Sequence, residues 1–371
     1  MLKTSFIGFC YKNILKPILF KMDPENVHDG FTRFGNFLGK SGAIKAVTSW
    51  LFNYKNPALE QKILGIDFPN PVGLSAGFDK DANLADILED VGFGFMEIGT
   101  VTNKPYIGNP KPRLIRLPNS KALLVNYGLK NIGVDKVIQK VRNSKSAGFV
   151  KAISVGRTNS SDTAELDAGI NDYFECFKKA ADSGLFNFYE INLSCPNTSG
   201  GEPFTTPDKL TLLLNKLYTL KINRPVFLKM PVNLEWGEFR QLLDVAVKHG
   251  VSGVTISNLS KNFAYEAIRD EIPAGAKGGV SGKPTEKLSN DLISKTYKEY
   301  GGKLLIIGVG GIFSAEDAYE KIKRGASLLE IITGMIYNGP QVIGEINRGL
   351  VELLKKDGYE NISQAIGSLI R

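Results

Sequence analysis

Short apolar runs recur along the chain from about residue 71 onward, and stretches with helical periodicity separate them. The runs cover residues 71–77, 95–100, 152–156, 188–194, 226–230, 253–258, 304–311 and 328–334. Each run is almost continuously apolar, which is typical of parallel strands that are covered on both faces. Eight such strand–helix units predict a (β/α)8 TIM barrel in the α/β class, with a doubly wound open sheet as the alternative.

Polar residues and glycines gather where these apolar runs end. In a barrel, the carboxyl ends of all strands meet at one face, and this face carries the active site. Such an alignment favours the barrel over the open sheet, because scattered loop polarity would not follow all eight runs. The residues concerned are Asp79, Lys80, Thr100, Ser154, Asn192, Lys229, Ser257, Asn258, Gly310, Gly311, Thr333 and Gly334.

The first fifty residues have a different pattern. Lysines interrupt a series of apolar residues, and amphipathic stretches follow at 27–38 and 43–52. The longest interval without a lysine is shorter than the ~18–20 residues that a membrane-spanning helix needs. We therefore predict a helical extension over residues 1–50 and a barrel over residues 51–371. Basic helices with one apolar face suit a membrane surface, and the pattern also fits helices that cap the barrel.

Composition narrows the chemistry. The 371 residues carry a net charge of +8, without a basic run or an aromatic-interleaved stripe, so we expect no nucleic-acid partner. The only histidines are His28 and His249, and the three cysteines lack metal-ligand spacing. We therefore expect no metal site and assign the chemistry to an organic cofactor or a thiol.

Three groups of residues are candidates for that chemistry. The stretch 188–203, FYEINLSCPNTSGGEP, holds more hydrogen-bonding groups than a plain turn needs, and lysines near Cys195 could lower the pKa of its thiol. Lys229 lies on an apolar strand, where a lysine needs an anionic partner. The glycine-rich ends at 308–312 and 332–336 match the usual phosphate site of a barrel. The alternatives are a buried structural cysteine, a lysine that reaches solvent or a carboxylate, and simple turn geometry.

Several motifs, in order, resemble the dihydroorotate dehydrogenase family from about residue 11 to 345. They are NPVGLSAGFDKDAN, GFGFMEIGTVT, GNPKPRLIRLP, INLSCPNT, GGVSGKP and LLIIGVGGI. The resemblance implies an FMN-dependent barrel that oxidises dihydroorotate to orotate in pyrimidine biosynthesis. The segment KPILFKMDPENVHDGF is similar to the start of the membrane-associated class, which implies quinone as the acceptor and a peripheral membrane location, on the cytoplasmic face in a bacterium.

The resemblance also implies roles for individual residues. Cys195 takes the position of the base that accepts the C5 proton, while hydride passes from C6 of the substrate to the flavin. Substrate contacts are expected from Lys80, Asn126, Asn192, Asn197 and Asn258. FMN contacts are expected from Ala76, Gly77, Lys80, Thr100, Ser154, Asn192, Lys229, Ser257, Gly282, Gly310, Gly311, Ile332 and Thr333.

Four positions depart from the family pattern. Cysteine replaces the serine base that is usual in the quinone-using class, and Ser154 replaces a flavin-side asparagine. In VNYGLKN, Val125 takes the position of a substrate-binding asparagine, and Asn126 comes one place late. Leu259 replaces a threonine. The departures keep three alternatives open: another cyclic amide or dihydropyrimidine as substrate, a soluble acceptor, and a barrel that binds without turnover.

Overall fold

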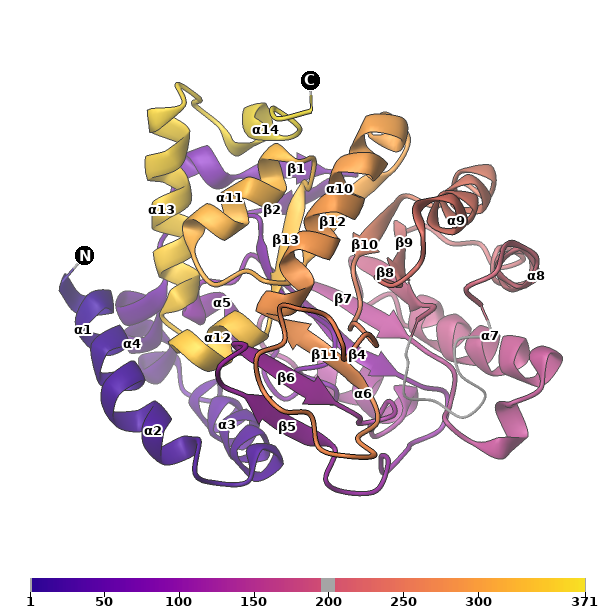
Figure 1. Cartoon of the computed structure of the whole chain (residues 1–371), viewed down its shortest axis with the longest axis horizontal. Coiled ribbons are helices and arrows are strands. Elements are labelled where there is room, and N and C mark those ends of the chain that lie inside the picture. Colours follow the sequence, from indigo (N-terminus) through magenta and orange to yellow (C-terminus); the bar gives the residue numbers. More distant parts are fainter. Residues whose placement is uncertain (1, 195–203, 371) are drawn as a thin grey trace.

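Eight parallel strands close into a barrel in a computed structural model, which describes residues 2–194 and 204–370 (Figure 1). The strands follow one another around the barrel in chain order, and each predicted apolar run supplies one of them. The TIM-barrel prediction is therefore confirmed. The strands are β3 (Val72–Leu74), β4 (Phe95–Val101), β7 (Val150–Val155), β8 (Phe188–Asn192), β9 (Val226–Met230), β10 (Gly253–Ile256), β12 (Leu305–Val309) and β13 (Leu328–Ile331).

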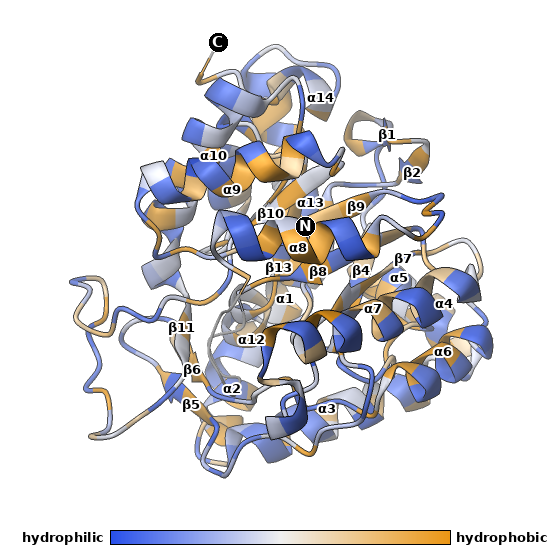
Figure 2. Ribbon diagram, turned by 90° about the vertical axis from the view of Figure 1, so that its right-hand side faces the viewer, coloured by the Kyte–Doolittle hydropathy of each residue, from blue (hydrophilic) through white to orange (hydrophobic). Residues whose placement is uncertain are grey.

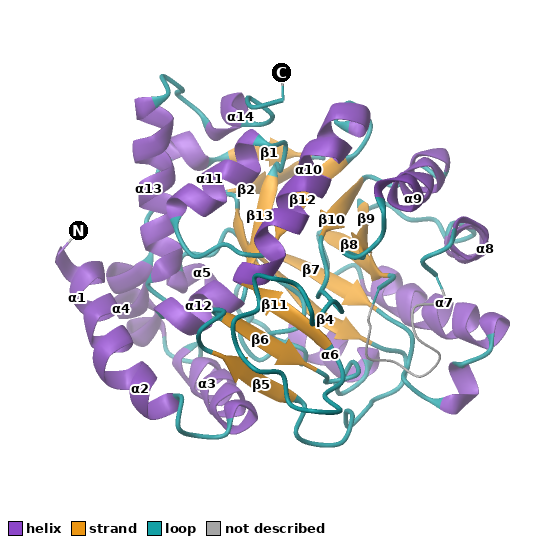
Figure 3. Ribbon diagram, viewed as in Figure 1, coloured by secondary structure: helices purple, strands orange, loops and turns teal. Residues whose placement is uncertain are grey.

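Helices surround the barrel and cover the outer faces of its strands (Figure 3). Several combine an apolar and a polar side, as the two colours of α7 and α9 in Figure 2 show. The longest, α7, ends where Gly184 adopts a left-handed conformation (φ +65°), which glycine reaches without a steric penalty. The helices are α5 (Leu88–Val91), α6 (Val134–Arg142), α7 (Leu166–Ser183), α8 (Pro207–Leu217), α9 (Trp236–Lys248), α10 (Glu286–Tyr300), α11 (Ala315–Lys323), α12 (Thr333–Asn338), α13 (Val342–Lys356) and α14 (Ile362–Ala365).

Aromatic residues fill the lower part of the barrel. Phe95, Phe188 and Phe227 belong to one buried cluster, in which the Phe188 ring contacts the other two in tilted arrangements. The hairpin of β1 (Gln61–Ile63) and β2 (Ile66–Phe68) closes this end, because Phe68 packs on Phe95 and Phe188. The barrel is therefore sealed below, and its open face is the one where the strands end.

A small antiparallel sheet and three short helical turns complete the barrel domain. The sheet consists of β5 (Leu114–Leu117), β6 (Ala122–Val125) and β11 (Gly279–Gly282), and it lies over the carboxyl ends of the barrel strands. It therefore forms a wall of any site on that face. The turns are η2 (Pro57–Leu59), η3 (Ser161–Thr163) and η4 (Lys283–Thr285).

The N-terminal extension is helical, as predicted. It consists of α1 (Leu2–Cys10), a π-helical segment η1 (Tyr11–Leu15), α2 (Lys16–Leu19), α3 (Pro24–Leu38) and α4 (Gly42–Phe52). Asp23 caps α3 by accepting a hydrogen bond from the Asn26 N–H at 2.8 Å, and Pro24 fits the first helical position. Across the described residues, none of the helices is long and apolar enough to span a membrane.

Candidate active site

A cleft opens on the barrel face where the strands end. One part of it, with about 530 Å³ of empty space, is lined by the turns after the last two strands, by the end of β11 and by Thr285 of η4. Gly310 and Gly311 have φ values of +107° and +75°, and a Cβ on Gly310 would come within 2.6 Å of the Thr285 hydroxyl. The first N–H groups of α12, from Thr333 onward, have no partner within their own helix. Backbone donors close to an open space suit a phosphate group.

Lys229 reaches this cleft from β9. Its ammonium donates to the Ser75 hydroxyl at 3.2 Å and lies 3.6 Å from Glu190 and 3.8 Å from Glu330. Burial by itself lowers the pKa of Lys229, but the carboxyl groups of Glu190 and Glu330 raise it above its usual value. Lys229 is therefore an ammonium at neutral pH, with one side toward the cleft.

A network of short polar side chains crosses the centre of the cleft. Asn192 donates to the Thr100 hydroxyl at 2.8 Å, and that hydroxyl lies 3.0 Å from the Ser154 hydroxyl. On the other side, Asn258 donates to the Asn192 amide oxygen at 3.1 Å and to the Ser194 carbonyl at 2.8 Å. These bonds hold two amides and a hydroxyl in fixed orientations beside the open space, as recognition of a polar ring requires.

Lys80 also lines the cleft, beside Tyr127. Its ammonium is 4.1 Å from the centre of the Tyr127 ring, which corresponds to a cation–π contact. Burial lowers the pKa of Lys80 to about 8, and the nearby Lys130 ammonium acts in the same direction. Its neighbour Asp79 has a structural role, since the carboxylate accepts hydrogen bonds from the backbone N–H groups of Asn83 and Leu84.

The end of β6 presents Val125 to the cleft, whereas Asn126, the next residue, points elsewhere. Val125, Tyr127 and Leu129 line the cleft. The side-chain oxygen of Asn126 instead accepts a hydrogen bond from Asn109 at 3.1 Å, and Asn126 lies in a separate groove with Arg113. The structure thus does not bring Asn126 to the cleft as it brings the other described substrate candidates.

An apolar cavity continues from the cleft toward the N-terminal helices. The cleft beside Lys80 has about 890 Å³ of empty space, and the adjoining cavity has about 640 Å³. The two share His28, Phe78 and Ile336 in their walls, and the cavity is also lined by Tyr11 and Phe31 of the extension. A path with apolar walls therefore leads from the cleft to η1 and α3 of the N-terminal extension.

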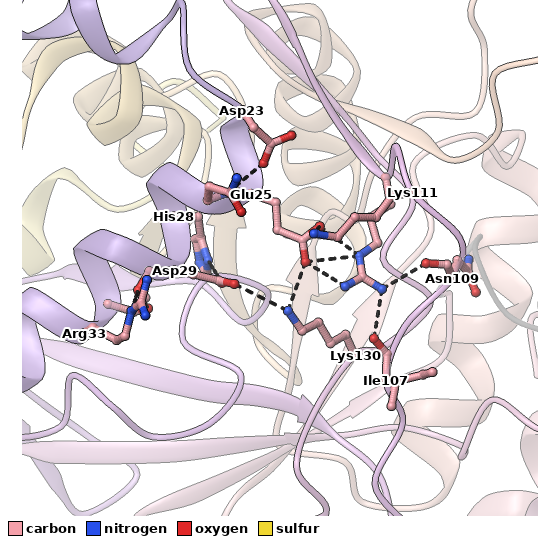
Figure 4. Close-up of polar contacts among 12 residues, drawn as sticks. Asp23, Glu25, His28, Asp29, Arg33, Ile107, Asn109, Lys111 and Lys130 are labelled. Atoms are coloured by element: carbon pink, nitrogen blue, oxygen red, sulfur yellow. Dashed lines mark hydrogen bonds and ion pairs between the residues drawn. The ribbon is translucent and has the colours of Figure 1, made fainter.

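A buried carboxylate fixes α3 on the barrel beside this path (Figure 4). Glu25 accepts three hydrogen bonds from Arg113, the shortest at 2.6 Å, and one from Lys130 at 3.0 Å, and Lys111 lies 3.4 Å away. Burial would raise the pKa of Glu25, but the hydrogen bonds from Arg113 and Lys130 lower it to about 2. The Arg113 guanidinium also lies 5.4 Å from the centre of the Tyr127 ring. The contacts that hold α3 on the barrel therefore reach a residue that lines the cleft.

The comparisons with known proteins agree on one family. A model described as dihydroorotate dehydrogenase matches residues 58–354. The chain belongs to the dihydroorotate dehydrogenase family. A relative from Nautilia profundicola, named dihydroorotate dehydrogenase (quinone), is 37% identical over 365 residues, which cover 96% of each chain. A relative of the same name from Nostoc punctiforme is 34% identical over 380 residues, which cover 97% of this chain and 98% of the relative.

A solved structure supports the same family. The crystal structure of DHODH in complex with ferulenol from Eimeria tenella aligns with a TM-score of 0.79 at 29% identity, over 89% of this chain and 96% of that chain. The resemblance seen in the sequence motifs is thus confirmed, including the quinone-using class. Membership of this family implies a flavin cofactor.

The residues present fit a flavin mononucleotide. The glycine-rich part of the cleft suits a phosphate, the centre offers amides and hydroxyls for a polar ring, and Lys229 offers a positive charge. In the described part of the chain, the buried Tyr127 hydroxyl has no hydrogen-bond partner, as expected beside a ligand site. Each of the following candidates lines the cleft: Ala76, Gly77, Lys80, Thr100, Asn192, Lys229, Ser257, Asn258, Gly282, Gly310, Gly311, Ile332 and Thr333.

Some predicted residues are not among the described residues that line the cleft, and some residues that line it were not predicted. Ser154 lies behind Thr100, and Cys195 and Asn197 lie outside the described residues. Sequence reasoning did not select Tyr127 or Ser281 as site residues, although both line the cleft. Tyr127 lies in the segment VNYGLKN, whose departure from the family pattern is the sequence feature that could have indicated a residue of the cleft. Ser281 lies in the GGVSGKP motif beside Gly282, which the motif did indicate.

Proposed function

We propose that the protein is an FMN-dependent dihydroorotate dehydrogenase that transfers electrons to a membrane quinone. One observation carries the proposal: a cleft with two lysines, Lys80 and Lys229, continues into an apolar cavity beneath the N-terminal helices. A polar substrate and an apolar acceptor need surfaces of opposite character. The two adjoining spaces offer both within one site.

The residues of the cleft divide the work of binding. The turns at Gly282 and at Gly310 and Gly311 would hold the FMN phosphate, and Lys229 would balance negative charge on the flavin ring. Lys80 would hold the carboxylate of dihydroorotate, with Asn192, Asn197 and Asn258 on its amide groups. When bound, the flavin supplies the redox chemistry by accepting hydride from C6.

Cys195 would act as the base. As a thiolate, its sulfur would take the proton from C5 and become a neutral thiol. The lysines would favour this chemistry electrostatically, because positive charge near a thiol stabilises its deprotonated form. The fixed amides would orient the ring so that both hydrogens leave from defined positions.

A second substrate class remains a candidate because of two apolar side chains. Val125 and Leu259 line the cleft where polar groups are usual in the family. A substrate with fewer polar groups on that side, such as another dihydropyrimidine, would leave fewer hydrogen bonds unmade. Comparing flavin reduction by dihydroorotate and by dihydropyrimidines without a carboxylate distinguishes the two candidates.

The cavity and the extension would form the quinone path. Of fifteen exposed large apolar side chains among the described residues, eleven belong to residues 6–50, and the others are Leu64, Ile107, Leu212 and Leu369. An apolar surface of this kind favours a membrane interface. We place the protein at the membrane surface as a peripheral enzyme, with Tyr11 and Phe31 at the entrance for quinone.

An anaerobic absorbance spectrum, recorded before and after addition of L-dihydroorotate, tests the proposal. We expect a flavin spectrum that bleaches with dihydroorotate and recovers on addition of a soluble quinone analogue. A flavin that stays oxidised with dihydroorotate but bleaches with another dihydropyrimidine would favour the second substrate class. Protein that takes up no FMN after reconstitution would contradict both candidates.

A further inference from the structure

Three glutamates form a buried cluster inside the barrel, directly below the cleft. Glu97, Glu190 and Glu330 project from β4, β8 and β13, and all three are fully buried. Their carboxylate oxygens lie within 4.8 Å of one another. Buried carboxyl groups are costly unless they are paired or protonated, so this arrangement calls for an explanation.

Lys229 is the cation of this cluster. Its ammonium lies 3.6 Å from Glu190 and 3.8 Å from Glu330. The residues paired with the four members of the cluster on neighbouring strands carry no titratable side chain; they are Gly73, Ala152, Ser154, Asn192, Phe227, Thr255 and Val309. Ser75 follows β3, and below the cluster lie the rings of Phe95, Phe188 and Phe227. Among the described residues, the charge of this layer therefore depends on three carboxyl groups and one ammonium.

The charges of these four groups do not balance if all are ionised. Three carboxylates and one ammonium would leave two uncompensated negative charges in the barrel interior. Burial raises the pKa of Glu97 well above its usual value, and the neighbouring Glu190 adds to the shift. Burial also raises the pKa of Glu330 to about 7, while Lys229 acts against it. Glu97 is therefore a neutral carboxylic acid at neutral pH, and the pKa of Glu330 lies close to neutral pH.

Glu330 is also the glutamate that reaches the cleft. It lines the cleft together with Ser75 and Lys229, whereas Glu97 and Glu190 do not. A change of charge in the cleft would act on Glu330 directly and through the ammonium of Lys229. In a water-poor interior such an interaction over a few ångströms is strong enough to move a proton.

We propose that the Glu330 carboxylate takes up a proton from solvent when the flavin is reduced. This proton offsets, within the barrel, the negative charge that reduction adds in the cleft. The inference rests on the proposed flavin at this site. Hydride from the donor delivers two electrons and one proton to the flavin. A second proton passes from water to the Glu330 carboxylate, which becomes a carboxylic acid, and nothing else is oxidised or reduced.

The test is the pH dependence of the flavin midpoint potential, measured by spectroelectrochemistry on the FMN holoprotein and on Glu330→Gln. Each proton taken up with two electrons changes the reduction equilibrium tenfold per pH unit, or about 30 mV. Above pH 7 we expect the wild type to be steeper than Glu330→Gln by one such step. Below pH 7 the two slopes converge, because Glu330 is then protonated in both states. The control Glu345→Gln, a half-buried glutamate on α13, keeps the wild-type slope.

A second measurement needs no variant. Photoreduction of the wild-type holoprotein in weakly buffered solution at pH 8, with an indicator dye, counts the protons taken up. We expect nearly two per flavin, and a value near one would overturn the inference, as would equal slopes in wild type and Glu330→Gln. Protein that binds no FMN would overturn the proposed function and this inference together, whereas bound FMN with equal slopes overturns this inference alone.

Discussion

At the scale of single residues, two lysines face one cleft under opposite electrostatic conditions. Lys229 has two carboxyl groups beside its ammonium, and the pKa of Lys229 is raised. Lys80 has the Tyr127 ring beside its ammonium instead, and burial, together with the charge of Lys130, lowers the pKa of Lys80 to about 8. Lys229 therefore keeps its charge at any physiological pH, whereas Lys80 does not.

The low pKa of Lys80 predicts a pH limit on substrate capture. The ammonium of Lys80 is present below pH 8 and is lost above it, and the anionic substrate then loses its partner. We expect kcat/KM for dihydroorotate to fall about tenfold per pH unit above pH 8, since this quantity reports the free enzyme. Lys80→Met should lower kcat/KM at pH 7 while flavin absorbance is retained. An unchanged pH profile in Lys80→Met would contradict the assignment.

Replacing Cys195 tests whether its thiol acts as the base or only fills space. Removing a general base lowers the rate of proton transfer by about 10²–10⁴-fold. We expect Cys195→Ala to lose activity by such a factor with FMN still bound, as measured by dihydroorotate-dependent bleaching in stopped flow. Cys176→Ala is the control, because Cys176 is buried in α7 and its thiol faces the Val101 carbonyl. A full bleaching rate in Cys195→Ala would exclude Cys195 as the base.

At the scale of elements, one carboxylate joins the N-terminal helices to the barrel. The partners of Glu25 lie more than eighty residues away in sequence, and the carboxylate is almost completely buried. We expect Glu25→Gln to lower the free energy of unfolding by about 2 kcal/mol at pH 7, since hydrogen bonds between charged groups are lost. Faster proteolysis between α3 and the barrel should accompany this loss.

The pH dependence of this effect has a definite sign. A folded-state pKa of about 2 for Glu25 means that its stabilisation is complete above the unfolded pKa near 4.5 and disappears as the pH falls toward 2. Denaturant titrations of wild type and Glu25→Gln should therefore converge at acid pH. Asp67→Asn serves as the control, because the Lys62–Asp67 pair is exposed and contributes little. Equal stability of wild type and Glu25→Gln at pH 7 would contradict this role.

At the scale of the whole molecule, the exposed apolar residues concentrate on one end. Phe6, Phe9 and Trp50 each expose more than 60% of their surface and belong to α1 and α4 (Figure 1). We expect Phe9→Glu with Trp50→Glu to reduce binding to anionic lipid vesicles and reduction of a long-chain quinone in them. Reduction of a short, soluble quinone should stay the same, because the cleft is unchanged.

The matched control lies on the other side of the barrel. Leu212 on α8 is 48% exposed, and Leu212→Glu adds a charge without touching the extension. This variant should bind vesicles as the wild type does. Equal loss in both variants would mean that added negative charge, rather than the apolar face, determines binding.

The barrel, the helical extension and most of the candidate site could be predicted from the amino-acid sequence. Strands covered on both faces must be apolar throughout, so all eight were visible as short apolar runs, and the residues that end them had to share one face. The amphipathic stretch predicted at 27–38 lies within α3, which begins at Pro24. The motifs of the family then located the residues that line the cleft.

How distant charges meet and which way each side chain points became visible in the folded chain alone. Glu97, Glu190 and Glu330 read as single polar interruptions of apolar strands, and nothing local predicts that they surround Lys229. Likewise, the position of Val125 in the cleft and of Asn126 outside it depends on how β6 pairs with β5 and β11. Periodicity follows from burial along one segment, whereas pKa shifts and ion pairs depend on distances between segments, which closure of the barrel sets.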